Sequence, residues 1–565
     1  MAGSQPRPER NRLKTIGDWC ARYPCWMLAL VTVAALVPFL AKPFNMDDPL
    51  FVWAAQQIQL HPGDPYGFSA NWYGIAEPMW AATQNPPLLS YYLAAVAEIF
   101  GWSETGLHLA CLLPAVTAVL GTYRLAKNFC RWPRFAALAT LFVPGFLVSS
   151  TTVMSDVPML AFWIWAVVFW AEGIRQNHRW KLSAAGALIA LAVLTKYNGI
   201  CLIPLLAAYG WIEKRSLGRW IIFLLIPVLV LCAHEWLTLR LYGHALFFYA
   251  NQYSSNNQTF HGLEKLVKAL NALTYTGGCF AVALFCAPFL WRKSVLSAIA
   301  ASAVLFVALA LAGGMMAKNF SWLAGSVRTS AELQICFWTV GGVCVLALAL
   351  GEAWRKRDAG SWLLALWVLG TFVFAAFFYW TINARALLPM APAVAILIAR
   401  RVEPDRSVLP AGIIFSIVAS AVLSLLAAQA DFQLASTTRK SAEQICTKYA
   451  TPSARLWFEG HWGFQYYMQA AGALPLDFTV AELDPADRLI IPVQNSNVPP
   501  PLLQKMTVLD IFELPVFPGF ATLSSEVGAS FYYSAGFGPL PFAFGRIPPE
   551  KFYVCTLKKP AENSH

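Results

Sequence analysis

An acidic pair, Asp47 and Asp48, directly follows the first apolar stretch of the sequence, in FNMDDPLFVWAAQQI. A carboxylate at such a position can take a proton from a hydroxyl group or hold a metal ion. The pair also suits the start of a helix, because Asp is a favoured N-cap residue and proline, here Pro49, a favoured first residue. The two uses are compatible, since one Asp can serve the helix while the other projects into a cavity.

The loop after the acidic pair is rich in aromatic residues. Tyr66, Trp72 and Tyr73 precede Glu77, and the loop ends in QNPPLLSYY, which contains Asn85. Trp and Tyr gather where a membrane meets water, so these side chains can form an interfacial belt. They can equally form a platform on which a sugar ring stacks. Both interpretations stay open at this stage.

A third acid and two cations mark the ends of later apolar stretches. Asp156, in VMSDVPMLAFW, opens one stretch, where a lone Asp is most often an N-cap. Lys196, in LTKYNG, and Arg385, in NARALLPMAP, lie beside two others. Such cations either reach toward lipid headgroups or bind phosphate, Arg as a planar fork and Lys as a point charge.

The elements that must position these residues are membrane spans. The chain has 565 residues, of which 58% are hydrophobic and 13% charged, whereas soluble proteins carry about 25% charged residues. The net charge of +11 lies in short loops, so it reflects topology and predicts no nucleic-acid partner. The candidate spans are 24–41, 86–101, 105–126, 134–152, 156–172, 181–195, 199–212, 219–239, 271–290, 294–313, 332–353, 361–380, 385–400 and 408–428.

The parity of the spans decides which side each loop faces. Segment 86–101 is short, opens with two prolines and contains Glu98, so we expect it to lie along the membrane surface. The remaining thirteen spans put 23 Lys and Arg in the loops of one side and 8 in those of the other. The positive-inside rule assigns the first side to the cytoplasm. Asp47, Asp156, Lys196 and Arg385 then all face the extracytoplasmic side.

The predicted fold is an all-α polytopic membrane protein with about thirteen spans and a small extracytoplasmic α/β domain. Its expected parts are a basic cytoplasmic tail (1–23), a transmembrane domain (24–429) with a first outer loop at 42–104, and the C-terminal domain (430–565). The strands expected there are RLIIPV, KMTVLDIFEL, SFYYSAGF and KFYVCTL. A disulfide between Cys446 and Cys555 is plausible outside the cytoplasm. The expected location is the plasma membrane of a bacterium.

Several stretches together carry a family resemblance. They are NMDDPLFVWAAQQI, NPPLLSYYLAAVAEIFG, MSDVPMLAFW, LAVLTKYNG and RALLPMAPAVAIL. In this order the chain resembles GT-C glycosyltransferases, in particular the protein O-mannosyltransferase-like and aminoarabinose-transferase-like groups. The resemblance implies an inverting transferase that takes a sugar from a polyprenyl-phosphate carrier at the extracytoplasmic face. Its expected partners are this donor, membrane lipids and an acceptor hydroxyl of a lipid, glycan or protein.

The resemblance also implies roles for individual residues. Asn85 departs from the family, which usually carries Lys or His before the proline pair, so the binding of phosphate is expected to pass to other cations. The expected catalytic acids are Asp47, Asp48 and Asp156. The expected substrate-binding residues are Asn85, Glu77, Tyr66, Trp72, Tyr73, Lys196, Tyr197, Arg385, Lys318 and Arg328.

Two other kinds of function compete with the transferase. A secondary transporter or lipid flippase usually places ionisable residues near the middle of the membrane, whereas here the middle of nearly every span lacks them. A non-catalytic relative that only binds the carrier lipid is the other alternative. No cofactor is assigned from the sequence, and a divalent metal ion with unknown ligands is left open.

Overall fold

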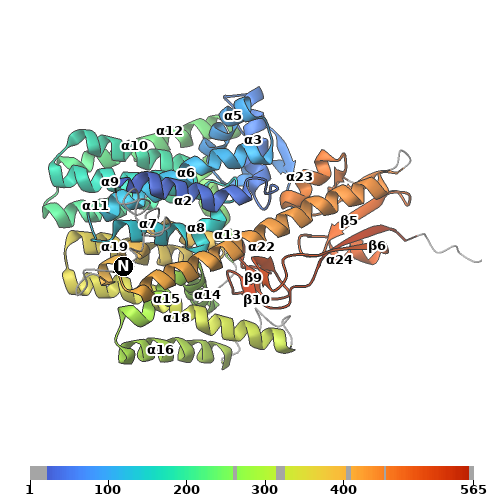
Figure 1. Ribbon diagram of the computed structural model, residues 1–565. Helices are drawn as coiled ribbons and strands as arrows, with labels where there is room; N and C mark the ends of the chain where they lie inside the picture. The colour runs from blue at the N-terminus through green and yellow to red at the C-terminus, as the bar shows by residue number, and fades with distance from the viewer. Residues whose placement is uncertain are drawn as a thin grey trace, which may run out of the picture.

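The computed structural model describes residues 22–258, 262, 264–312, 325–402, 409–450, 454–480 and 482–558. A bundle of helices makes up most of the structure, and a β-sheet region lies at one end of it (Figure 1). The helices up to residue 242 are α2 (Pro24–Leu36), α3 (Asp48–Leu60), α4 (Met79–Thr83), α5 (Leu88–Phe100), α6 (Glu104–Ala126), α7 (Pro133–Leu141), α8 (Pro144–Ser149), α9 (Asp156–Gln176), α10 (Arg179–Thr195), α11 (Leu202–Lys214) and α12 (Leu225–Tyr242).

The second half of the bundle contains several longer helices. In an apolar environment the backbone must satisfy its own polar groups, which is why apolar runs fold as helices. The helices are α13 (Leu246–Asn256), α14 (Glu264–Cys279), α15 (Ala281–Leu290), α16 (Lys293–Ala312), α18 (Gly325–Lys356), α19 (Ala359–Val373), α20 (Ala384–Leu387), α21 (Ala391–Val402) and α22 (Ala411–Tyr449).

Six of the described helices are long and apolar enough to cross a membrane, and α14 with α15, bent by 80°, makes a seventh candidate. The chain is therefore an integral, multi-pass membrane protein. Other expected spans are shorter or broken; segment 134–152, for example, is divided into α7 and α8. Helix length among the described residues does not by itself establish thirteen crossings. The six helices are 104–126, 156–176, 219–242, 327–356, 359–378 and 411–449.

Helix α5 corresponds to the segment that was expected to lie along the membrane surface. Its 13 residues extend about 20 Å, less than the roughly 30 Å of the hydrocarbon core. It packs against α3 and α6, and its end is exposed at Ile99 and Phe100. The helices α2 and α11, which lie in expected spans, also have 13 residues, so length does not test the surface position, which stays a prediction.

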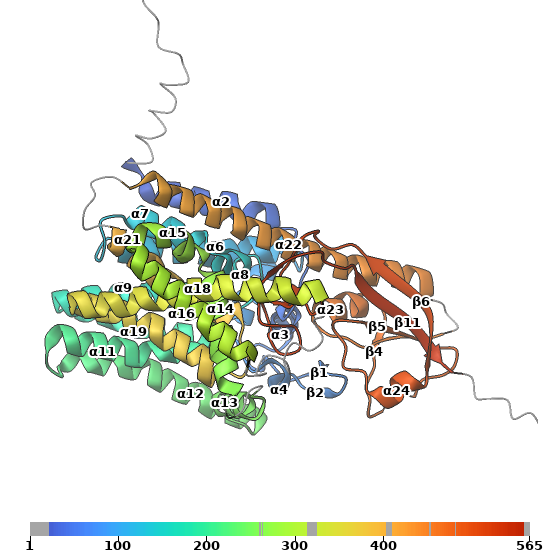
Figure 2. The ribbon, with the colours of Figure 1, turned by 90° about the horizontal axis from the view of Figure 1, so that it is seen from below.

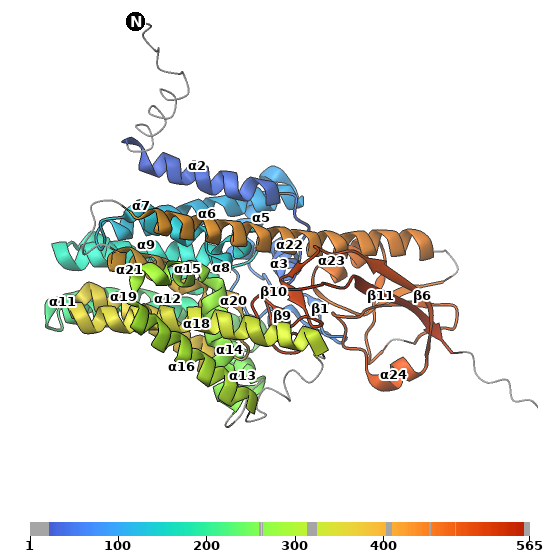
Figure 3. The same ribbon diagram turned by 60° about the horizontal axis from the view of Figure 1, so that its bottom comes forward.

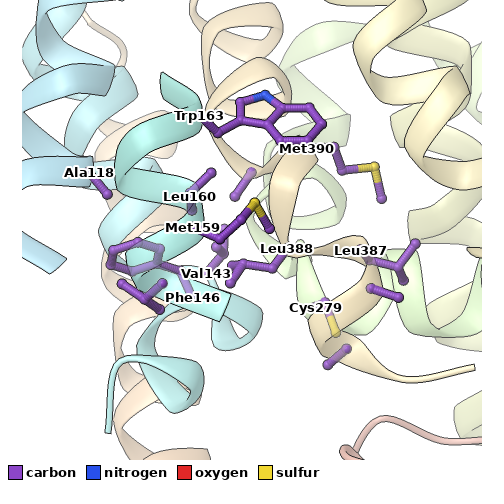
Figure 4. Packing of buried hydrophobic residues seen from close by; sticks show 14 of the residues in the cluster. Ala118, Val143, Phe146, Met159, Leu160, Trp163, Cys279, Leu387, Leu388 and Met390 are labelled. Atoms are coloured by element: carbon purple, nitrogen blue, oxygen red, sulfur yellow. The ribbon is translucent and has the colours of Figure 1, made fainter. Parts of the chain in front are cut away.

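Close packing of apolar side chains holds the start of α9 against α8 and the segment after Arg385. Figure 4 shows Met159 and Leu160 of α9 beside Val143 and Phe146, with Leu388 nearby. All five side chains are almost fully buried. This core fixes the start of α9, where Asp156 lies, and the segment that follows Arg385.

The long helix α22 joins the bundle to the sheet region. Its 39 residues run without a break through the expected domain boundary at residue 430, and it can be followed from the bundle to the sheet in Figures 1 and 3. The same hydrophobic core contains membrane helices and residues from Phe520 to Ala543. The C-terminal region is therefore packed onto the bundle rather than tethered by a linker.

A five-stranded sheet with the order β4-β3-β5-β11-β6 forms the outer part of this region. Strand β3 is parallel to β4 and β5, whereas β11 is antiparallel to β5 and β6. The helix α23 (Trp462–Ala470) contacts α22 and α3. The strands are β3 (Leu456–Phe458), β4 (Leu474–Pro475), β5 (Arg488–Pro492), β6 (Met506–Leu514) and β11 (Glu550–Leu557), and the short pairs are β1 (Ser69–Asn71) with β2 (Ala76–Pro78), β7 (Phe520–Ala521) with β10 (Ala543–Phe544), and β8 (Leu523–Ser524) with β9 (Ala529–Ser530).

Three of the four expected C-terminal strands are present, and the fourth is wrong. RLIIPV, KMTVLDIFEL and KFYVCTL form β5, β6 and β11. In SFYYSAGF only Ser530 is in a strand. The next residues bond to the membrane region instead, since Ala384 N donates to Phe531 O at 2.9 Å and Ser534 N donates to Ile382 O at 3.1 Å. Successive side chains of this segment, Phe531 and Tyr532, are both almost fully buried, so it packs on more than one side and does not form a half-buried strand.

The disulfide expected between Cys446 and Cys555 is also wrong. Both thiols are free and buried. Cys446 packs near Met468, with the two sulfur atoms 3.7 Å apart, whereas Cys555 belongs to a different cluster of buried side chains. Each thiol behaves as a small apolar side chain.

The contact between α23 and the loop before Asp47 leaves no room for a side chain at Gly463. A Cβ atom there would lie 2.1 Å from the carbonyl oxygen of Phe44. We expect Gly463→Ala to lower the free energy of unfolding by about 1–3 kcal/mol, because overpacking displaces the helix. Thermal unfolding in detergent measures this. Gly351→Ala is the control, since nothing lies within 4 Å of its Cβ position; equal melting temperatures for the two variants would contradict the expectation.

A half-buried carboxyl group in β11 makes the stability of the C-terminal region depend on pH. Burial, with a smaller effect from Glu526, raises the pKa of Glu550 from 4.5 to about 7. The folded state therefore holds a proton that the unfolded state releases between pH 4.5 and 7, and its stabilisation is lost as the pH rises through 7. We expect the melting temperature to fall by a few degrees between pH 5 and 8. Glu550→Gln should flatten this slope, and an unchanged slope would refute the assignment.

Candidate active site

A cavity of about 1110 Å³ lies where the bundle meets the C-terminal region. Figure 2 shows α3, α4 and α13 near this junction, with α23 and the sheet beyond them. Four parts of the bundle line the cavity, namely residues 46–85, 196–201, 247–257 and 374–385. The C-terminal region completes the lining with stretches between His461 and Phe537.

Two acids and two cations form one ionic cluster at the cavity. Arg385 Nη1 donates to Asp47 Oδ2 at 2.8 Å and lies 4.0 Å from Asp156 Oδ2. Lys196 Nζ donates to Asp156 Oδ1 at 2.5 Å. The cluster thus brings together four of the residues expected from the sequence, each from a different element.

Local structure explains how these side chains reach one place. Asp156 is the first residue of α9, and Lys196 follows the last residue of α10 in an extended conformation. Arg385 lies in the short helix α20, whose N-cap Asn383 accepts a hydrogen bond from Ala386 N at 2.7 Å. A helix start, a helix end and a capped turn therefore supply the three positions.

The two acids of the pair have different surroundings. Asp47 borders the cavity, and 28% of its side chain is exposed. Asp48 is fully buried, and its two oxygens accept hydrogen bonds from the backbone N–H groups of Asn45 and Val153, both at 2.8 Å. Burial raises the pKa of Asp48 to about 7. Asp48 therefore joins the loop to the turn before Asp156, whereas Asp47 faces the cavity.

Asp156 lies behind the cations rather than at the cavity surface. It is 1% exposed and is absent from the cavity lining, which does contain Lys196 and Arg385. A buried carboxylate beside two cations holds them in fixed positions. This geometry favours a positioning role for Asp156 over direct contact with a substrate.

Backbone conformation adds a separate sign of a functional site. Met46, Gln84 and Trp462 have positive φ values of 47°, 44° and 63°, and all three line the cavity. Such conformations cost energy for residues other than glycine and cluster at functional sites. Met46 and Gln84 direct the chain immediately before Asp47 and Asn85, and Trp462 opens α23.

The remaining residues predicted for the first loop take different positions. Trp72, Tyr73, Glu77 and Asn85 line the cavity. Tyr66 is buried outside the lining and donates from its hydroxyl to Asn85 O at 2.6 Å. Trp72 and Tyr73 of this loop thus lie at the cavity, whereas Tyr66 lies behind Asn85.

Three predicted binding residues lie outside the first loop. Tyr197 lines the cavity, and its hydroxyl lies 3.2 Å from His234 Nε2. Arg328 is exposed, pairs with Glu332 at 2.9 Å and does not line the cavity. Lys318 lies outside the described residues. Of the cations expected to replace a charge at Asn85, only Lys196 and Arg385 are placed at the cavity by the described structure.

A second buried network was missed by sequence reasoning. Lys42 pairs with Asp431 of α22, and both side chains are fully buried. Asp431 also accepts hydrogen bonds from Thr522 Oγ1 at 3.1 Å and from the Tyr532 hydroxyl at 2.7 Å. The Tyr532 ring in turn lies 5.6 Å from the Arg385 guanidinium. A lone lysine and a lone aspartate at apolar segment ends were the available signals.

Metal ligands do not gather in the described part of the chain. No group of three or more His, Cys, Asp or Glu side chains there could hold a metal ion. The site is therefore built from an ion-paired cluster, aromatic rings and amides.

One family model matches the chain. Residues 84–237 match the family described as dolichyl-phosphate-mannose-protein mannosyltransferase. This stretch includes Asn85, Asp156, Lys196 and Tyr197. No curated protein matches the sequence significantly.

Three kinds of solved structure are similar to this chain, all at TM-scores below 0.5, so none of them carries an argument about fold or function. The oligosaccharyltransferase AglB from Archaeoglobus fulgidus, in complex with an inhibitory peptide and a dolichol-phosphate, has a TM-score of 0.47 and 13% identity over 81% of this chain and 65% of its own. The chain thus spans less than two thirds of that protein. ArnT from Cupriavidus metallidurans bound to undecaprenyl phosphate has a TM-score of 0.45 and 15% identity over 87% of this chain and 96% of its own. Arabinofuranosyltransferase AftD from Mycobacteria has a TM-score of 0.38 and 12% identity over 96% of this chain and 40% of its own.

The family match falls on the part of the chain that carries three of the five motifs quoted above. The match therefore supports the resemblance through these three motifs. The motifs at Asp47 and Arg385 lie outside the matched residues. Over residues 84–237 the chain is thus similar to the protein O-mannosyltransferase family, in agreement with the resemblance drawn from its motifs.

Proposed function

We propose that the protein is an inverting glycosyltransferase that moves a sugar from a polyprenyl-phosphate carrier to an acceptor hydroxyl. The observation that carries this proposal is the ionic cluster, in which Asp47 and two cations border the same cavity. A transfer of this kind needs a group that accepts the proton of the acceptor and positive charge that stabilises the departing phosphate.

Arg385 and Lys196 are the proposed phosphate-binding residues. Both line the cavity, and Arg385 Nε is buried without a hydrogen-bond partner among the described residues. Arg suits a phosphate because its planar fork can form two parallel hydrogen bonds. The Asp156 carboxylate supports these cations from behind, and the Tyr532 ring packs near the Arg385 guanidinium.

Asp47 is the proposed general base. In the absence of substrate its carboxylate is paired with Arg385. A donor phosphate that binds Arg385 competes for this guanidinium and leaves the Asp47 carboxylate available for the acceptor hydroxyl. The acceptor oxygen then bonds to the anomeric carbon, its proton passes to Asp47, and the carbon–oxygen bond to the phosphate breaks on the opposite face with the electron pair on the phosphate.

The proposed topology places this reaction outside the cytoplasm. The chain crosses the membrane thirteen times, with α5 along the surface and the C-terminal region on the same side as the cavity. The distribution of 23 against 8 basic residues supports it. In a bacterial host, a C-terminal alkaline phosphatase fusion should be active, because that reporter folds only outside the cytoplasm; an inactive but expressed fusion would refute the topology.

The transfer itself is tested with purified protein in vesicles that contain polyprenyl-phosphate-linked sugars. We expect release of free polyprenyl phosphate that depends on an added acceptor and is absent with Asp47→Asn. Movement of intact carrier between the two leaflets without any release would instead support the flippase alternative and refute the transferase.

A further inference from the structure

Four aromatic side chains of the C-terminal region form a continuous arc along the cavity. The ring centroids of His461 and Trp462 are 4.6 Å apart, and those of Trp462 and Phe537 are 5.9 Å apart. Phe537 continues to Tyr533 at 6.2 Å. All four residues line the cavity. Such distances are those of directly packed rings.

Three aromatic side chains of the bundle close this arc into a ring. Trp380 lies 5.2 Å from Tyr533, and Tyr253 lies 6.0 Å from Trp380. The hydroxyls of Tyr253 and Tyr73 share a hydrogen bond, and Tyr73 returns to His461 at 5.7 Å. These three residues also line the cavity. We call the seven side chains the aromatic collar.

The collar is held rigidly from behind. Asn495 fixes His461, because its side chain donates to His461 O at 2.6 Å and accepts from His461 N at 3.4 Å. Trp462 is kept in its positive-φ conformation at the start of α23. Costly backbone conformations of this kind cluster at functional sites, where the surrounding structure holds them in place.

Charge divides the cavity into two sides. The acidic and basic side chains of the lining, Asp47, Glu77, Lys196 and Arg385, all come from the bundle. The C-terminal lining contributes aromatic rings, amides and serines, and the pKa of His461 is lowered to about 4 by burial, so this ring is neutral. A phosphorylated or acidic acceptor would find no cation on that side.

The chemistry of the collar suits a sugar. One face of a sugar ring presents C–H groups, which pack favourably on the electron-rich face of an aromatic ring. Its hydroxyl groups need hydrogen-bond partners, and two buried atoms of the lining, Glu77 Oε1 and His461 Nδ1, have none among the described residues. A peptide is instead recognised mainly through backbone hydrogen bonds and side-chain pockets.

We propose that the aromatic collar binds the acceptor and that this acceptor is the terminal sugar of an uncharged glycan. The inference rests on the proposed function, because the collar is an acceptor site only if the protein transfers a sugar. The adjacent ionic cluster is assigned to the donor. Tyr532, beneath Arg385, precedes Tyr533 of the collar in the sequence, so the two sites are neighbours.

The test measures binding without requiring transfer. Saturation-transfer NMR with the purified full chain would report binding of neutral probes, for which we choose mannotriose, maltotriose and cellotriose. We expect at least one probe to bind to the wild type. Trp380→Leu and Tyr533→Leu should each weaken this binding about tenfold, which corresponds to roughly 1.4 kcal/mol. Trp211→Leu is the control, because Trp211 is 60% exposed and lies outside the cavity lining.

The outcomes separate this inference from the proposed function. Binding that is weakened in both collar variants and kept in the control supports the collar. If no lipid-linked sugar is consumed in the transfer experiment, that result refutes the transferase and leaves the binding result in place. Absence of binding by all three probes, or equal binding by the collar variants and the wild type, overturns the inference. Transfer to a peptide or a phosphorylated lipid but to no neutral glycan overturns it as well.

Discussion

Asp47→Asn is expected to lower the rate of sugar transfer by about 10²–10⁴-fold, the range typical for loss of a general base. The amide cannot take the proton of the acceptor, although it occupies nearly the same volume. Asp47 is partly exposed and Asp156 still faces Arg385, so we expect the variant to fold. Initial rates with a labelled polyprenyl-phosphate sugar measure the effect.

Asp48→Asn is the matched control for this prediction. Its carboxylate accepts two backbone hydrogen bonds and does not border the cavity. An amide can accept with only one of its two terminal atoms, so the main expected effect is a lower melting temperature. If Asp48→Asn reduced the transfer rate of the folded protein as strongly as Asp47→Asn, the separation of roles within the pair would be wrong.

Arg385→Gln is expected to have the second large effect, on both binding and stability. Arg385 pairs with Asp47, lies 4.0 Å from Asp156, and only 14% of its side chain is exposed. Removing one partner of a buried pair leaves charge without compensation and costs about 3–5 kcal/mol, and the residual exposure here places the expected loss near the lower value. Binding of polyprenyl phosphate should also be lost.

The two consequences of Arg385→Gln are separated by further variants. Arg385→Lys should recover most of the stability but only part of the affinity, because a point charge cannot replace the planar fork. The double variant Asp47→Asn with Arg385→Gln should be more stable than Arg385→Gln alone, since it removes the unpaired carboxylate. Strictly additive losses of stability would contradict the ion pair.

The sequence predicted the ionic cluster better than the shape of the cavity. Asp47, Asp156, Lys196 and Arg385 were found because a charge beside an apolar stretch stands out, and the loop assignment placed them on one side. Their partners in the pair network could not be derived, since the contacts join residues 40 positions apart, as in Lys196 and Asp156, or 338 positions apart, as in Arg385 and Asp47.

The part played by the C-terminal region was not predictable from periodicity. Alternation in SFYYSAGF predicted a strand, but the pattern reports only that one face is buried, not which surface covers it. Similarly, α22 passes the expected boundary at residue 430 because its buried polar residue Asp431 is satisfied by Lys42, Thr522 and Tyr532. A polar residue in an apolar helix could therefore be noticed in the sequence, but its partners could not be named.

The central claim is that the cluster around Arg385 binds the phosphate of a polyprenyl carrier beside Asp47. The most direct measurement is an experimental structure of the full chain in lipid nanodiscs with added polyprenyl phosphate. The account predicts a phosphate within hydrogen-bond distance of Arg385 and Lys196, with Asp47 turned from Arg385 toward the cavity. A phosphate bound elsewhere, with the Asp47–Arg385 pair intact and the cavity empty, would contradict it.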